Sequence, residues 1–377
     1  MIKGLYLHIP FCEKICVYCD FHKEIAKDQK KKDYIYRLIQ SIKDHQKDLQ
    51  SLKTIYIGGG TPSNMESSLL KELLMAIKQT VDVSSLEEYT IESNPNDVSL
   101  EKAKLYHDYG INRVSLGVQS FDEQILKAMN RSHQREDIYK SISNLRQVGI
   151  ENISIDLIFG FHKQTLEQVE EDLKEARTLD VPHISYYALI LEEKSIMYHL
   201  VKEGKIRIVD EDLDYLMYNR IIDTLTKDGY IHYEISNFAK SGYASKHNLL
   251  YWQQADYLGL GSGAHSYINQ NRFFIKPNVR KYIDSQEDQD CIENYPSYPL
   301  EDALLFGLRV LKGLHVPTLE DQHQCVLLEE YPSLLTHLES GLLTYEDDYI
   351  RFTKKGLMLS NLVFEAIMGD HNAETTS

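Results

Sequence analysis

The sequence predicts an α/β protein with a mostly parallel sheet in its first half. Short apolar strands alternate with amphipathic helical stretches up to residue 188, and polar residues or glycines follow several strands directly. Such alternation implies parallel pairing with right-handed crossovers. Six strand–helix units can close partly into a barrel or form an open sheet, and periodicity alone does not distinguish these arrangements.

The individual elements follow from the apolar spacing. Six segments are predicted as strands: Gly4–His8, Thr54–Ile57, Tyr89–Glu92, Arg113–Val118, Ile153–Ile158 and Ile184–Ala188. The predicted helices are Tyr34–Leu49, Leu69–Ile77, Leu100–Tyr109, Glu123–Met129, Asp137–Gln147, Leu166–Leu179 and Asp212–Leu225. Because the carboxyl ends of parallel strands meet at one edge of a sheet, we expect the chemistry there.

The second half predicts a different organisation. A stretch from Tyr230 to Tyr267 is irregular and rich in aromatic residues and glycine, and a small α+β domain of winged-helix type is expected from Pro299. Its predicted elements are a helix at Leu304–Leu311, a hairpin of Leu342–Tyr345 and Tyr349–Phe352, and a closing helix at Leu357–Met368. We therefore expect three segments, at residues 1–240, 241–290 and 291–377.

Composition and charge narrow the classes of partner. The 377 residues include 41 basic and 57 acidic side chains, for a net charge of −16, with 42% hydrophobic residues. Nucleic-acid binding needs clustered cations, and the one dense basic run, Lys27 to Lys32, is interpreted as a solvated helix start. No apolar run approaches the roughly 20 residues of a membrane span. Met1 to Pro10 lacks the pattern of a signal peptide, so a cytoplasmic protein is expected.

Three of the five cysteines, Cys12, Cys16 and Cys19, form a C-x3-C-x2-C motif. In a reducing cytosol such a cluster more often binds metal than forms disulfides. Three thiolates on one loop can hold three irons of a [4Fe-4S] cubane, which leaves the fourth iron free for a chelating small molecule. The alternative is a zinc site completed by His8 or His22.

Several other residues at the strand ends are candidates for ligand binding. The glycine run 58–62 follows the second strand, and glycines let a ligand approach the backbone closely. Glu92 ends the third strand and is suited to accept hydrogen bonds from ribose hydroxyls. Gln119, Arg131 and Asp156 are further polar candidates, although each taken alone is also compatible with an ordinary structural role.

Taken together, these residues resemble the radical S-adenosylmethionine (SAM) superfamily. More narrowly, they resemble the family that unites oxygen-independent coproporphyrinogen III oxidases with heme chaperones. The matching stretches are CEKICVYCDF (12–21), GGGTP (58–62), ESNP (92–95), RVSLGVQSF (113–121), NRSH (130–133), DLIFG (156–160), YEISNFA (233–239), HNLLYW (247–252) and DYLGLGSGAH (256–265). The resemblance spans nearly the whole chain and implies a partial (β/α)6 barrel that binds a [4Fe-4S] cluster and SAM.

The resemblance assigns roles position by position. It places the cluster on Cys12, Cys16 and Cys19. It places one or two SAM molecules against Tyr6, Tyr18, Gly59, Gly60, Thr61, Glu92, Gln119, Arg131 and Asp156. Electron transfer from such a cluster to the SAM sulfonium yields a 5′-deoxyadenosyl radical, a chemistry that belongs to the cofactors.

Three features favour the heme-chaperone branch. Phe21, preceded by Asp20, stands where the oxidases carry a fourth cysteine, and the cysteine motif begins at residue 12 without the longer leader of the oxidases. The stretch 247–252 resembles an HNxxYW motif whose histidine, here His247, is implicated in holding heme. The resemblance therefore predicts a chaperone that delivers heme to a recipient hemoprotein, with a respiratory recipient as a candidate and a homodimer by analogy.

Two other functions stay open. One is porphyrin synthesis, by radical oxidative decarboxylation of two porphyrinogen propionates. The other is a radical SAM enzyme acting on RNA, which the acidic composition disfavours.

Two loops depart from the family pattern. Gly160-Phe161-His162 replaces Gly-Leu-Pro, and 192–195 reads EEKS in place of Glu-Pro-Gly-Thr. We expect these changes to alter loop shape and contacts with a substrate or partner. Cys291 and Cys325 lie outside the motif and are assigned no chemistry, since free thiols usually pack as small apolar groups.

Overall fold

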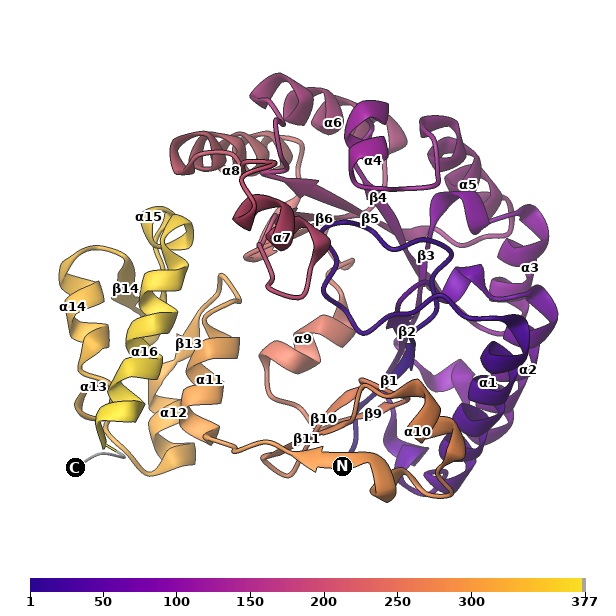
Figure 1. Ribbon diagram of the computed structural model, residues 1–377. Helices are drawn as coiled ribbons and strands as arrows, with labels where there is room; N and C mark the ends of the chain where they lie inside the picture. Colours follow the sequence, from indigo (N-terminus) through magenta and orange to yellow (C-terminus); the bar gives the residue numbers. More distant parts are fainter. Residues whose placement is uncertain (375–377) are drawn as a thin grey trace.

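The structure is a computed structural model that describes residues 1–374 (Figure 1). Within that range no helix is long and apolar enough to cross a membrane. The strands form a large sheet in the order β12-β11-β10-β9-β1-β2-β3-β4-β5-β6-β8-β7 and a small one in the order β13-β15-β14.

Six parallel strands, each followed by a helix, form the centre of the large sheet. They lie side by side in chain order, and each neighbouring pair is parallel. The strands are β1 (Gly4–Ile9), β2 (Thr54–Gly59), β3 (Glu88–Ser93), β4 (Arg113–Gln119), β5 (Asn152–Phe159) and β6 (His183–Ala188). The six predicted strands and their parallel pairing are thus confirmed.

The helices between these strands follow one another around the outside of the curved sheet (Figure 1). They are α1 (Asp28–Asp44), α2 (Ser67–Thr80), α3 (Leu100–Asp108), α4 (Glu123–Ala128), α5 (Arg135–Gln147) and α6 (Leu166–Leu179). In α1, Ile35, Leu38 and Ile42 are fully buried at helical spacing. The basic run before them forms the first turns of this helix, as the sequence predicts.

Further strands, mostly antiparallel to their neighbours, extend the sheet on both sides. β9 (Tyr257–Leu260) lies parallel to β1, and β10 (His265–Ile268), β11 (Asn271–Ile275) and β12 (Ile292–Asn294) continue that side. On the other side β6 is followed by β8 (Asn237–Ala239) and β7 (Ile231–Glu234). The strands of the large sheet therefore form one linear series. The stretch predicted to be irregular, Tyr230–Tyr267, contains β7, β8, β9 and most of β10, whose three or four residues are too few for a visible alternation.

The remaining elements of the first part are helices α7 (Ile196–Lys202), α8 (Glu211–Lys227), α9 (Lys246–Trp252) and α10 (Val279–Asp284). Helix α8 agrees with the helix predicted over the same region. Helix α9 contains the HNLLYW stretch and packs between β2 and the C-terminal part of the chain. This position makes α9 the link between the large sheet and the small domain.

The C-terminal part carries the small sheet, set to one side of the large one (Figure 1). Its elements are α11 (Pro299–Gly307), β13 (Leu314–His315), α12 (Val316–His323), α13 (Leu327–Glu330), α14 (Ser333–Glu339), β14 (Leu343–Glu346), β15 (Tyr349–Phe352), α15 (Lys354–Met358) and α16 (Ser360–Glu374).

The predicted hairpin is confirmed, and Asp347 and Asp348 form its turn with positive φ angles, which aspartate tolerates. Helix α11 begins five residues earlier than predicted, with Pro299 at its first position. The closing helix is interrupted at Leu359. The limits of the three predicted segments stay a prediction. Strand β12, which follows residue 290, belongs to the large sheet.

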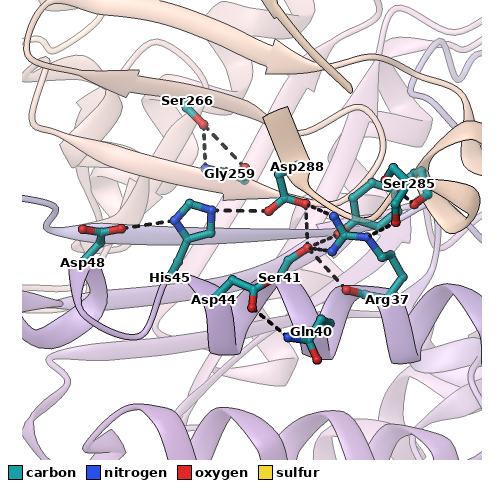
Figure 2. Close-up of polar contacts among 11 residues, drawn as sticks. Arg37, Gln40, Ser41, Asp44, His45, Asp48, Gly259, Ser266, Ser285 and Asp288 are labelled. Carbon is teal, nitrogen blue, oxygen red and sulfur yellow. Dashed lines mark hydrogen bonds and ion pairs between the residues drawn. The ribbon is translucent and has the colours of Figure 1, made fainter. Parts of the chain in front are cut away.

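A buried polar network fastens α1 to the segment after α10 (Figure 2). Arg37 Nη2 donates to Asp288 Oδ1 at 2.7 Å, and Arg37 Nε donates to the carbonyl oxygen of Ser285. Ser41 Oγ also donates to Asp288, and His45 Nε2 lies 3.3 Å from its other oxygen. The hydrogen bond to Asp288 raises the pKa of His45. The buried carboxylate of Asp288 thus has the Arg37 guanidinium as its counter-charge and His45 as a second partner.

Replacing Asp288 by asparagine leaves the Arg37 guanidinium buried without its counter-charge. We expect the free energy of unfolding to fall by roughly 3–5 kcal/mol, the usual cost of removing one partner of a buried pair. Because the folded-state pKa of His45 is raised, the stability it contributes is full below its unfolded pKa of about 6.5 and is lost as pH rises through the folded value. Urea unfolding of the native protein and of Asp288→Asn at pH 6 and pH 8.5 measures the loss of stability in the variant and the pH dependence that His45 contributes.

The matched control is Asp284→Asn, which removes an exposed ion pair with Arg280 on α10. It should cost about 1 kcal/mol or less. Equal losses in the two variants would show that the network is not a stabilising element.

Candidate cofactor site

A cavity of about 470 Å³, here called the cysteine cavity, lies at the carboxyl ends of the parallel strands. The loop after β1 lies inside the arc of helices (Figure 1) and supplies one side of it. Sequence-predicted residues that line it are Cys12, Cys16, Tyr18, Cys19, Gly59, Gly60, Thr61, Glu92, Gln119, Arg131 and Asp156. The expectation that these loops meet at one edge of the sheet is therefore confirmed for all the predicted cluster and SAM residues except Tyr6.

The cysteine loop is closed at its base by backbone hydrogen bonds. Cys12 N–H donates to the carbonyl oxygen of Glu24 at 3.1 Å, and Glu24 N–H donates to that of Pro10 at 2.7 Å. Farther along, Val17 N–H donates to the carbonyl oxygen of Met129, at the end of α4. These contacts fix a short loop whose three cysteines all line the cysteine cavity.

Two side chains donate hydrogen bonds to the cysteine sulfurs. Thr61 Oγ1 lies 3.5 Å from Cys12 Sγ, and Arg131 Nη1 lies 3.5 Å from Cys16 Sγ. Arg131 Nη2 also donates to Asn94 Oδ1 at 2.6 Å and to the carbonyl oxygen of Gly117 at 2.5 Å. Burial raises the pKa of Cys12, and it raises that of Cys19 to about 11. A bound metal would displace the protons that these thiols otherwise keep.

The glycine run brings the turn after β2 against the cysteine loop. Gly60 N–H donates to the carbonyl oxygen of Ile9, and Thr61 N–H donates to that of Phe11, both at 2.8 Å. A Cβ on Gly60 would lie 2.9 Å from the backbone nitrogen and oxygen of Phe11. Gly59 has a φ of +119°, which residues with a side chain rarely adopt. The run is therefore required by the packing of two backbone segments.

Glu92 lies at the bottom of this site with both carboxylate oxygens engaged. Tyr56 OH donates to Oε1 at 2.8 Å, and Gly59 N–H donates to Oε2 at 3.1 Å. Burial, with a smaller effect of the nearby Asp156 charge, raises the pKa of Glu92 to about 7. Asp156 accepts hydrogen bonds from Ser115 Oγ, and burial raises its pKa as well. Two carboxyl groups thus line one cavity, each with a hydroxyl partner on a neighbouring strand.

Gln119 adopts a left-handed conformation, with a φ of 67°, at the end of β4. The turn after it is held by Asp172, a buried carboxylate on α6. Asp172 accepts from Phe121 N–H at 2.7 Å and from Ser120 Oγ at 3.0 Å. Burial raises the pKa of Asp172 to about 7. Asp172 therefore positions Gln119 without lining the cavity.

A second cavity of about 1,110 Å³, here called the aromatic cavity, adjoins the first. The two share lining residues that include Tyr56, Glu92 and Asn248. Tyr6 lines this second cavity, and its hydroxyl oxygen lies 2.9 Å from His8 Nδ1. His8 and His22 also line this cavity and are not among the residues that line the cysteine cavity.

His247 is fully buried at the start of α9. Its Nδ1 is hydrogen-bonded to Thr54 Oγ1 at 2.6 Å, and its Nε2 to Tyr251 OH at 2.7 Å. Its backbone N–H donates to Glu88 Oε1. Burial, reinforced by the charge of Arg113, lowers the pKa of His247 to about 3. The ring lines neither cavity, so iron coordination by His247, which stays a prediction, requires one of these hydrogen bonds to break.

Comparison with known proteins agrees with this arrangement. The sequence model of the radical SAM superfamily matches residues 6–176. The heme chaperone HemW of Lactococcus lactis subsp. lactis (strain IL1403) is 38% identical over 372 residues, which cover 98% of each chain. HemW of Bacillus subtilis (strain 168) is 38% identical over 381 residues, which cover 98% of this chain and all of the relative. The chain belongs to the HemW family.

A solved structure shares the fold. Coproporphyrinogen III oxidase (HemN) from Escherichia coli, described as a radical SAM enzyme, superimposes with a TM-score of 0.81 over 97% of this chain and 90% of that chain. At 22% identity this likeness shows the fold alone. It confirms the predicted fold class, and the radical SAM match at residues 6–176 spans most of β1 and all of β2 to β5.

Some residues at the site were not singled out from the sequence. Asn94 and Arg113 line the cysteine cavity within stretches quoted for the resemblance, so position within those stretches was their only signal. Asn248 lines both cavities from inside the HNLLYW stretch. Asp172 sits within an amphipathic helix, where a single buried acid leaves no recognisable pattern.

The loop after β1 and the turn after β2 lie so close together that a methyl group added at Gly60 should destabilise the fold. In Gly60→Ala the new carbon meets the backbone of Phe11, which cannot move aside as a flexible side chain does. We expect the free energy of unfolding, measured in urea, to fall by about 1–3 kcal/mol.

Gly369→Ala is the matched control, because a Cβ at that position in α16 meets nothing within 4 Å. It should raise the stability by up to about 1 kcal/mol. If Gly60→Ala is as stable as the native chain, the packing assigned to the glycine run is wrong.

Proposed function

We propose that this chain is a heme chaperone, which binds heme and passes it to a recipient hemoprotein on a scaffold that carries a [4Fe-4S] cluster and SAM. The observation that carries the proposal is the similarity to HemW along nearly the whole chain, including the part beyond the radical SAM match. Phe21 in place of a fourth cysteine supports the same branch of the family.

The residues of the cysteine cavity fit a cluster bound by Cys12, Cys16 and Cys19. Three thiols on one closed loop line the cavity, and donors from Thr61 and Arg131 reach two of the sulfurs. Such donors stabilise thiolate sulfur, and they are typical of groups that tune iron–sulfur sites.

The same cavity has the polar groups that a SAM molecule needs. Glu92 and Asp156 offer carboxylate oxygens to ribose hydroxyls, and Gly59 and Gly60 also line the cavity. Arg131 Nε is buried without a partner among residues 1–374, so it can still donate one hydrogen bond. When bound together, cluster and SAM supply reductive carbon–sulfur cleavage. The chain orients the ligand and limits its contact with water.

The second candidate function is oxidative decarboxylation of porphyrinogen propionates, as in coproporphyrinogen III oxidase. The observation in its favour is the fold shared with HemN over nearly the full length. A cytoplasmic location, a homodimer and the identity of the recipient stay predictions.

The cluster assignment is tested by replacing Cys16 with alanine. After anaerobic reconstitution we expect the variant to lose most of the iron, the sulfide and the visible absorption of the native protein, because one of three ligands is gone. Cys325→Ala is the control, since Cys325 lies in the C-terminal domain, between α12 and α13. Unchanged iron and sulfide in Cys16→Ala would show that the cluster is held elsewhere.

The chaperone function is tested by titrating the reconstituted protein with heme and then adding an apo-hemoprotein. We expect saturable one-to-one binding in the Soret region and transfer of the heme to the acceptor. Absence of saturable binding would contradict the proposal. The protein would then be offered coproporphyrinogen III with SAM and a reductant, and release of CO2 would support the oxidase function.

A further inference from the structure

We infer that the aromatic cavity is the heme-binding site of this chain and that the imidazole of His265 is the axial ligand of the heme iron. The inference rests on the proposed function, because it names the place and the ligand for the heme that a chaperone must hold. It assigns a role to the last residue of the stretch 256–265, which the cluster and SAM leave without one.

Three imidazoles reach the aromatic cavity, and two of them are engaged. His8 contacts Tyr6 OH through Nδ1 and the carbonyl oxygen of His22 through Nε2, at 2.9 Å each. His22 contacts Ser262 Oγ through Nε2 at 3.0 Å. Among the side chains that the structure describes, none is hydrogen-bonded to the ring of His265, which is exposed at the start of β10. Of these three imidazoles, His265 is therefore the one with neither ring nitrogen hydrogen-bonded within residues 1–374.

His265 stands beside two aromatic rings in nearly parallel orientation. It pairs across the sheet with Phe274 on β11, at a centroid distance of 5.3 Å and an interplanar angle of 17°. Tyr295, just after β12, lies 5.7 Å from His265 and 4.7 Å from Phe274, at angles of 13° and 27°. Because an axial imidazole stands perpendicular to the porphyrin plane, rings aligned with His265 would meet the porphyrin with their edges and surround the iron ligand with apolar contacts.

The size and rim of the cavity also fit heme. Its volume of about 1,110 Å³ lies just above the range of about 300–1,000 Å³ for pockets that bind small molecules, as a large ligand requires. At its rim Phe21 is 62% exposed and Tyr295 is 42% exposed, an unusual exposure for rings of this size. A flat apolar ligand would cover both.

Cations at the same rim can meet the heme propionates. Lys23, Lys194 and Lys276 all line the cavity. Lys276 pairs with Glu293 at 3.0 Å, whereas Lys194 has no ion-pair partner within residues 1–374. An ammonium group without a counter-ion at the edge of an aromatic pocket is suited to a ligand with a carboxylate on an apolar ring system.

The hydrogen bond between His247 and Tyr251 gives the HNLLYW stretch a structural role in heme binding that does not require His247 to coordinate the iron. Tyr251 lines the aromatic cavity, and its hydroxyl is held by His247 Nε2 at 2.7 Å. Loss of His247 would free Tyr251 and loosen α9 from β2. A weaker heme complex in His247→Ala therefore does not by itself identify the ligand, and a test must report coordination.

The test is a heme titration of the anaerobically reconstituted protein, followed by Soret difference spectra and by electron paramagnetic resonance of the ferric heme. Native protein, His265→Gly, His247→Ala and the distant control His107→Ala are compared, with circular dichroism to verify folding. We expect His265→Gly to bind heme at least roughly tenfold more weakly, the smallest loss usual at metal sites when a supporting group is removed. Added imidazole should restore the native spectrum in this variant alone, because it replaces the missing ligand.

Each outcome decides one claim. If the native protein binds heme and His265→Gly gives the same affinity and spectrum, the inference is overturned while the chaperone function stands. Rescue by imidazole in a His247 variant, and not in His265→Gly, would also overturn it. If the native protein does not bind heme at all, both the proposed function and the inference are wrong.

Discussion

The candidate cofactor site depends on the close backbone contact between the loop after β1 and the turn after β2. Parallel pairing places the two strand ends side by side, and the hydrogen bonds from Gly60 and Thr61 to Ile9 and Phe11 bring the segments together. Only a residue without a side chain fits at Gly60. With the loops held so closely, Thr61 reaches Cys12, and Glu92 on the next strand binds the turn through Gly59 N–H. The cysteine cavity follows from this contact.

A second constraint links the core to the C-terminal domain through α9. At its start His247 is hydrogen-bonded to Thr54 on β2. At its end Trp252 stacks on Phe306 of α11, and the Arg309 guanidinium lies 4.6 Å from the centre of its indole ring. The outer residues of the HNLLYW stretch thus act as structural anchors, while Asn248 and Tyr251 between them face the cavities. In the folded chain these anchors position one wall of the aromatic cavity.

How much could be predicted from the sequence depends on how local each signal is. The six parallel strands have apolar runs of their own, and the cysteine loop and glycine run directly follow two of them, so both fold and cysteine cavity were predictable. The edge strands were not, because three to five residues carry too little periodicity.

Hydrogen bonds between buried residues that are far apart in the chain also could not be predicted from the sequence. Nothing in the sequence around His247 indicates that both ring nitrogens are occupied by Thr54 and Tyr251, and nothing around Asp172 indicates the turn that it holds. The aromatic cavity joins residues from β1, α9, β10, β11 and the segment after β12, which only the folded chain brings together.

The central claim is that the cluster on the three cysteines and SAM occupy one cavity, so that SAM binds at the iron without a protein ligand. It is tested most directly by electron paramagnetic resonance of the reduced, reconstituted protein with and without SAM. The account predicts that the g values of the reduced cluster change when SAM is added and that the change saturates with SAM concentration. A cluster spectrum that is identical with and without saturating SAM would contradict it.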